Sequence, residues 1–118
     1  MNRKRRLDLE ADALAQVNVG RALAGLETLL ALPKGEGGNY LTCPIALALG
    51  PDCGAGASTA LFSSVKLAKA YALAWHGDES RLQDNVQWHG VTLPFSLRLF
   101  IAMFDHGDFP HLIKESPK

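Results

Sequence analysis

The residue of this chain with the clearest chemical potential is Cys43, a cysteine followed directly by a proline. Thr42 or Cys43 can cap a helix that begins at Pro44, because proline lacks the N–H that a first helical turn leaves unpaired. A thiol at a helix N-terminus lies in the positive field of the helix dipole, which lowers its pKa and can make it a nucleophile. The alternative is a buried, inert thiol. We favour it, because cysteine is among the most buried residue types.

A cysteine enzyme also needs a histidine that the fold brings close to the thiol. Four histidines are available, and no spacing singles one of them out: His76, His89, His106 and His111. The sequence contains no Walker-type glycine loop, no G-x-S-x-G elbow, no H-E-x-x-H helix and no dinucleotide fingerprint. We therefore expect no catalytic residues and no cofactor, and we favour a non-enzymatic protein.

Two groups of side chains are candidate metal ligands. Cys43 and Cys53 stand ten positions apart, whereas zinc sites usually contain a closer pair such as C-x2-C. A disulfide between them needs Cα atoms within about 7 Å and would be labile in the cytosol. The segment 105–111 is rich in aspartate and histidine, but Asp105 and His106 followed by glycine also fit the end of a helix. We favour the helix end and expect no metal.

The only dense basic run lies at the start of the chain and consists of Arg3, Lys4, Arg5 and Arg6. Such an arm can contact the phosphates of a nucleic acid, with an affinity that falls as salt rises. No recognition helix with base-reading residues accompanies it. We therefore favour a disordered leader over residues 1–6, and nucleic-acid binding through these four residues is the alternative.

Length and charge limit the function further. The chain has 118 residues, of which 47% are apolar, so we expect one hydrophobic core and a single domain over 1–118. Lys and Arg number 12, as do Asp and Glu, so a net charge of zero gives no long-range attraction to nucleic acid or anionic lipid. A neutral, apolar protein has little self-repulsion, and we expect a homo-oligomer, most simply a homodimer.

The basic start resembles that of a signal peptide, but acidic residues follow where an apolar run would be required: Asp8, Glu10 and Asp12. The apolar runs are far shorter than the roughly 20 residues of a membrane-spanning helix. We therefore expect a cytoplasmic protein without membrane contact, whose cysteines are reduced thiols.

The pattern of apolar residues predicts a mainly α fold. Its spacing predicts four helices, over residues 7–32, 44–49, 64–75 and 94–105. Gly20 and Gly25 fall inside the first helix, where they indicate a kink or a close contact with another helix, and we favour the contact. We also expect a short β-hairpin at 86–93, flexible connections at 34–39 and 52–58, and a disordered tail at 114–118.

Two stretches carry a family resemblance. The first is Cys43-Pro44-Ile45-Ala46-Leu47-Ala48-Leu49, and the second comprises Leu93-Pro94, Phe100-Ile101, Phe104-Asp105, Gly107, Phe109-Pro110 and Leu112-Ile113. The chain thereby resembles small proteins of actinobacteria and their phages that carry a CPIA-x-AL element and an LP…FI…FD-x-G-x-FP-x-LI ending. The resemblance covers the middle and the C-terminal half of the chain. It implies a bacterial or phage protein of the cytosol, and it implies no activity.

From the sequence we expect a small non-enzymatic interaction or regulatory protein. The resemblance implies that a bacterium or a phage encodes it. It would act by binding a host protein or a second copy of itself. Two alternatives stay open. The first is a nucleic-acid-binding protein that uses the basic N-terminal arm, and the second is a thiol- or metal-dependent enzyme centred on Cys43.

Overall fold

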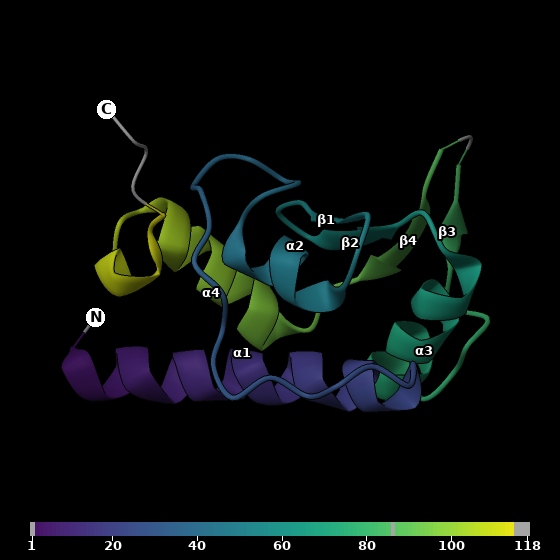
Figure 1. The fold of residues 1–118 in the computed structure, drawn as a ribbon, viewed down its shortest axis with the longest axis horizontal. Coiled ribbons are helices and arrows are strands. Elements are labelled where there is room, and N and C mark those ends of the chain that lie inside the picture. The colour runs from purple at the N-terminus through teal and green to yellow at the C-terminus, as the bar shows by residue number, and fades with distance from the viewer. Residues whose placement is uncertain (1, 86, 115–118) are drawn as a thin grey trace.

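The part of the chain that the computed structural model describes, residues 2–85 and 87–114, combines four α-helices with a four-stranded antiparallel sheet (Figure 1). The helices are α1 (Arg3–Leu23), α2 (Pro44–Leu49), α3 (Val65–His76) and α4 (Phe95–Asp105), and a short 3-10 helix, η1 (Pro110–Leu112), follows. The strands are β1 (Cys53–Ala55), β2 (Thr59–Phe62), β3 (Gln83–Asp84) and β4 (His89–Thr92), in the order β1-β2-β4-β3.

The prediction of a mainly α fold is wrong, because 47% of the described residues are helical, 13% of them lie in strands and the strands form one sheet. The protein has a mixed α/β fold. A hairpin of β1 and β2 replaces the flexible connection expected at 52–58, with Gly54 opposite Leu61. Each residue of β1 is small and buried, so this strand lacks the alternation by which a strand is recognised. β2 does alternate, with Ala60 and Phe62 buried.

Of the hairpin expected at 86–93, only one strand, β4, lies in that range, and its hairpin partner β3 precedes it. β3 pairs with β4 through Gln83 opposite Gly90 and Asp84 opposite His89, and Val86 lies outside the described residues. A lone two-stranded ribbon is marginal in water. The β3–β4 hairpin is not a lone ribbon, because β4 also pairs with β2 along its other edge.

α1 begins and ends earlier than the helix predicted over 7–32. The Asn2 side chain accepts a hydrogen bond from the Arg5 N–H at 2.9 Å, so the leader expected to be disordered is helical from its third residue. At the other end Gly25 has φ +79°, and the Leu26 N–H donates to the Arg21 carbonyl at 2.8 Å. This is a left-handed helix stop. The interpretation of Gly25 as a packing residue is therefore wrong.

The segment that follows α1 is held against the helix by side chains rather than by helical hydrogen bonds. The Asn18 amide accepts from the Leu29 N–H at 2.7 Å and donates to the Leu29 carbonyl at 2.9 Å. Arg21 donates to the carbonyls of Glu27 at 2.6 Å and Ala48 at 2.7 Å. Leu29 and Leu32 pack against the core here without forming a helix, whereas Leu30 is fully exposed.

The other three helices lie where the sequence places them, to within one residue. α2 has the predicted bounds, with Cys43 as its N-cap. Ser64 caps α3, and Gly77 ends it in the left-handed conformation at φ +68°. At the C-terminus, residues 115–118 of the tail expected to be disordered lie outside the described residues, and Lys114 donates its N–H to the Gly35 carbonyl at 2.9 Å.

Tyr71, on α3, is fully buried and contacts residues of α1, α2 and β2. A Cβ at Gly20 of α1 would overlap ring carbons Cδ1 and Cε1 of Tyr71, so only glycine lets the two helices approach this closely. The Tyr71 hydroxyl donates to the Leu49 carbonyl of α2 at 2.8 Å, and burial raises the pKa of Tyr71, so the hydroxyl stays a donor. The ring also stacks on Phe62 of β2, with centroids 5.2 Å apart. The predicted close contact at Gly20 is confirmed.

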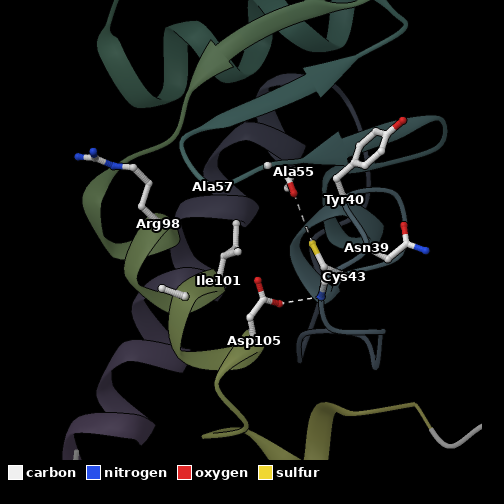
Figure 2. Close-up of a pocket in the computed structure, with 11 residues that line it drawn as sticks. Asn39, Tyr40, Cys43, Ala55, Ala57, Arg98, Ile101 and Asp105 are labelled. Carbon is white, nitrogen blue, oxygen red and sulfur yellow. Dashed lines mark hydrogen bonds between the residues drawn. The ribbon is translucent and has the colours of Figure 1, made fainter.

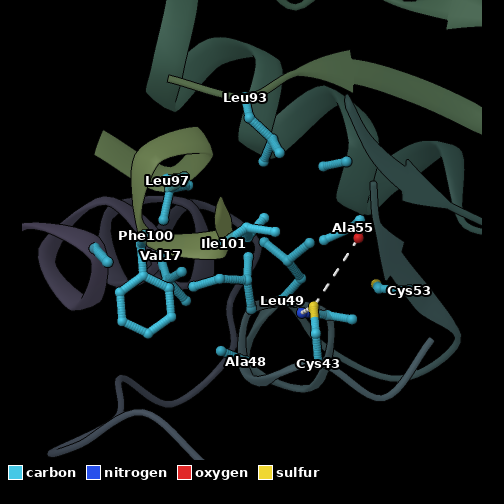
Figure 3. Packing of buried hydrophobic residues seen from close by; sticks show 14 of the residues in the cluster. Val17, Cys43, Ala48, Leu49, Cys53, Ala55, Leu93, Leu97, Phe100 and Ile101 are labelled. Carbon is cyan, nitrogen blue, oxygen red and sulfur yellow. Dashed lines mark hydrogen bonds between the residues drawn. The ribbon is translucent and has the colours of Figure 1, made fainter. Parts of the chain in front are cut away.

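α4 packs against α1, and its apolar residues belong to the same core as α2. Figure 3 shows Leu97, Phe100 and Ile101 of α4 in one buried cluster with Leu49 of α2. Every residue of α2 is buried except Leu47. No helix of residues 2–85 and 87–114 is long and apolar enough to cross a membrane.

We predict that Gly20→Ala destabilises the protein by about 2 kcal/mol, because the added methyl group overlaps the Tyr71 ring and overpacking costs about 1–3 kcal/mol. In an open helical position the same change would stabilise by about 1 kcal/mol. Urea unfolding measures the difference. The control is Val19→Ala, on the exposed face of α1 beside Gly20, which should leave the stability almost unchanged. A Gly20→Ala variant as stable as the wild type would contradict the packing described.

Candidate functional site

Cys43 caps α2, and its thiol is buried at only 3% residue exposure. The sulfur accepts a hydrogen bond from the Ala46 N–H at 3.4 Å, and the S–H points to the Ala55 carbonyl 4.0 Å away (Figure 2). Pro44 stands at the first helical position as the sequence predicts. The thiol thus pairs with a free backbone N–H at the start of α2 from inside the core.

The electrostatic environment keeps this thiol protonated. Burial raises the pKa of Cys43 above its ordinary value of 9.0. The Ala46 N–H, at the start of α2, lowers this pKa by less than burial raises it, and the Asp105 carboxylate raises it further. The helix N-terminus therefore does not produce the thiolate that a nucleophile requires.

A pocket of about 360 Å³ lies beside Cys43, between the loop before α2, the β1–β2 turn and α4. Its titratable lining side chains are Tyr40, Cys43, Arg98 and Asp105. Figure 2 shows the Asp105 carboxylate directed towards the loop, and it accepts the Gly38 N–H at 3.0 Å. The lining includes polar groups for binding a ligand but no imidazole to act as a base.

The four histidines lie elsewhere. His76 bonds the Thr92 carbonyl at 2.8 Å, and His89 bonds Asp84 at 2.7 Å. His111 bonds the Glu10 carboxylate at 2.6 Å, and His106 caps the end of α4. The structure brings none of them to the Cys43 pocket.

The second cysteine is also a buried thiol. Cys53 is free, and burial followed by the charge of Asp52 raises its pKa to about 12. Cys43 is free as well. Of the candidate metal ligands at 105–111, Asp105 and His106 form the end of α4, Gly107 follows with φ +90°, and His111 lies in η1. Within the described ranges, no group of three or more histidine, cysteine, aspartate or glutamate side chains could hold a metal ion.

The basic run forms the first turn of α1. Successive residues of a helix are rotated by about 100°, so Arg3, Lys4, Arg5 and Arg6 point in four directions around the axis. Arg3 and Arg6 line a hollow against the chain after α4, whereas Lys4 and Arg5 do not. The four charges thus form no single flat surface for a nucleic-acid duplex.

A third hollow, of about 560 Å³, lies at the end of α2 and has no counterpart in the sequence analysis. Leu41 and Leu47 line it and are 42% and 43% exposed. We call it the Leu41–Leu47 groove. The sequence offers no signal for it, because a six-residue apolar helix has no polar face from which the exposed position could be identified.

Comparison with known proteins gives no match: neither a protein-family model, nor a curated protein, nor a solved structure matches the chain.

We predict that Cys43 reacts slowly with a thiol reagent in the native protein. In a Cys53→Ser variant the modification of Cys43 should be at least about tenfold slower than in the same protein unfolded in urea, because burial limits access and each unit of pKa increase lowers the thiolate fraction tenfold. The native rate should still rise above pH 9.0, since the folded pKa lies above that value. A native rate that levels off near neutral pH would show an activated thiolate and contradict this description.

Proposed function

We propose that this is a non-enzymatic interaction protein that works by docking protein surfaces, and that the partner which fits the Leu41–Leu47 groove is a second copy of the chain. One observation carries the proposal: two large apolar side chains, each more than 40% exposed, line a groove of about 560 Å³. Exposed apolar surface around a hollow is typical of a protein interaction site. Leu47 is also the single residue of α2 that the core does not bury.

The groove is complementary in charge to a copy of itself. Arg21 and Asp52 both line it. In a pair related by a two-fold axis, Arg21 of each copy can meet Asp52 of the other, because such an interface uses the same surface twice. The hydrogen bonds of Arg21 to backbone carbonyls use Nε and Nη1, so Nη2 remains for a carboxylate. The net charge of zero adds no long-range repulsion between copies.

The segment beside the groove is held in place before any partner binds. The Tyr40 carbonyl accepts the Ala55 N–H of β1 at 2.7 Å, and the side chains of Tyr40 and Leu41 lie over Gly54. Tyr40 is 48% exposed, and tyrosine is enriched in protein interfaces. A surface fixed in this way loses little conformational entropy on association.

The described contacts support docking over the two alternatives. The raised pKa of Cys43 and the absence of a histidine from its pocket weigh against a thiol enzyme. The distribution of Arg3, Lys4, Arg5 and Arg6 around α1 weighs against a duplex-binding face. The two free cysteines fit a reducing compartment, and the proposal places the protein in the cytoplasm.

Sedimentation equilibrium tests the proposal. The wild type should form a concentration-dependent dimer, and Leu47→Asp should weaken it at least about tenfold, because the variant places a charge in the apolar part of the interface. Leu73→Asp is the matched control. Leu73 lies on α3 with 42% exposure, so the control makes the same change at equal exposure outside the groove. It should leave the dimer intact.

Asp52→Asn tests the charge pairing separately. Asp52 has φ +56°, a conformation that asparagine tolerates, so the variant keeps the local backbone and loses only the charge. It should weaken the dimer and reduce its sensitivity to salt. A wild type that stays monomeric up to about 1 mM would overturn the proposal in favour of a different partner. Equal dissociation of the Leu47→Asp and Leu73→Asp variants would overturn it too.

A further inference from the structure

We propose that the hollow between the first turns of α1 and the chain after α4 binds a small oxyanion attached to an apolar group. The hollow has a volume of about 480 Å³. One wall is the face of α1 that carries Arg3, Arg6 and Leu7, and the other wall is the segment 107–111. The site is separate from the Leu41–Leu47 groove and does not depend on self-association.

The α1 wall supplies the positive charge. Arg3 and Arg6 are three residues apart on a helix, so their side chains are neighbours. In the described ranges the ion pairs within 4.0 Å are His89 with Asp84 and His111 with Glu10, and neither involves these arginines. The two guanidinium groups therefore repel each other, and they also oppose the positive end of the helix dipole.

An oxyanion between the two guanidinium groups would remove both repulsions. The planar fork of an arginine matches the two oxygens of a carboxylate or a phosphate, and such charge-assisted hydrogen bonds are about twice as strong as neutral ones. Carboxylate and phosphate share this chemistry, so the geometry assigns an oxyanion and the experiment separates the two.

One acidic residue of the hollow lies on the arginine wall, and its carboxylate is already bonded to the opposite wall. The Glu10 carboxylate is bonded to His111 Nε2 at 2.6 Å, and this pair joins the two walls at one end. Asp108 is the other acidic lining residue, and it belongs to the wall opposite the arginines. An anion is therefore expected against α1 rather than in the centre of the hollow.

The remaining lining favours an apolar body on the ligand. Leu7 is 54% exposed, and Phe109 is buried against Phe100 with ring centroids 4.6 Å apart. The wall is anchored just beyond, where the Gly35 N–H donates to the Leu112 carbonyl at 2.8 Å. The volume is in the range of small-molecule sites and is larger than a bare phosphate needs. A ligand with an aromatic or aliphatic group beside its oxyanion fits these walls.

Calorimetric titration of the full chain tests the proposal with four probes: phenyl phosphate, benzoate, inorganic phosphate and benzyl alcohol. We expect saturable binding of phenyl phosphate, benzoate or both, and the tighter of the two identifies the oxyanion. Inorganic phosphate lacks the apolar body and benzyl alcohol lacks the charge, so each should bind at least about tenfold more weakly. If neither phenyl phosphate nor benzoate shows saturable binding up to about 10 mM, the proposal is wrong.

Two double variants show whether the charge acts at this site. Arg3→Gln with Arg6→Gln should weaken binding at least about tenfold. Lys4→Gln with Arg5→Gln removes the same charge from the same turns of α1 but from residues outside the hollow, and should change binding by less than about twofold. Circular dichroism checks that both variants keep α1.

The unmodified protein gives a second measurement that needs no variant. The Nε–H signals of Arg3 and Arg6 should shift on titration with the bound probe in an NMR experiment, while that of Arg5 stays in place. Equal weakening in both double variants, or equal shifts of all three arginine signals, would show a diffuse basic surface and overturn the proposal.

Discussion

The contact between Tyr71 and Gly20 is the constraint on which the rest of the structure depends. The ring occupies the space that a side chain at Gly20 would need, so α1 and α3 approach more closely than larger residues allow. Its hydroxyl then binds the last residue of α2 through the Leu49 carbonyl. One side chain therefore sets the positions of three helices, and its stacking on Phe62 adds the sheet.

Fixing α2 in this way determines what Cys43 can do. All residues of the helix except Leu47 are buried, and its N-cap Cys43 lies in the same buried cluster (Figure 3). In that position desolvation outweighs the helix N-terminus, and the pKa of the thiol rises. Leu47 is the only exposed side chain of α2. The burial of Cys43 and the exposure of Leu47 support the proposal of binding at the surface of this helix.

The sequence predicted the features that depend on local signals. Pro44 and Gly77 mark helix ends through their backbone preferences and Ser64 through its side-chain hydroxyl, and these ends lie within one residue of the predicted bounds. The strand pairing was not predictable in the same way, because β1 consists of small buried residues whose partners lie elsewhere in the chain. The prediction of a helix up to residue 32 was wrong because Gly25 ends the helix. The apolar residues that follow have the spacing of a helix, but their segment is held by the Asn18 side chain instead. The Leu41–Leu47 groove arises from tertiary packing, and the spacing of apolar residues in the sequence does not predict it.

A double-mutant cycle between positions 20 and 71 tests the central contact most directly. The free energy of unfolding is measured for Gly20→Ala in the wild type and in a Tyr71→Leu background, where the ring is absent. If the ring causes the overlap, the cost of Gly20→Ala should disappear in the second background, giving a coupling energy of about 2 kcal/mol. An equal cost in both backgrounds would contradict the account, because it would mean that something other than Tyr71 excludes a side chain at Gly20.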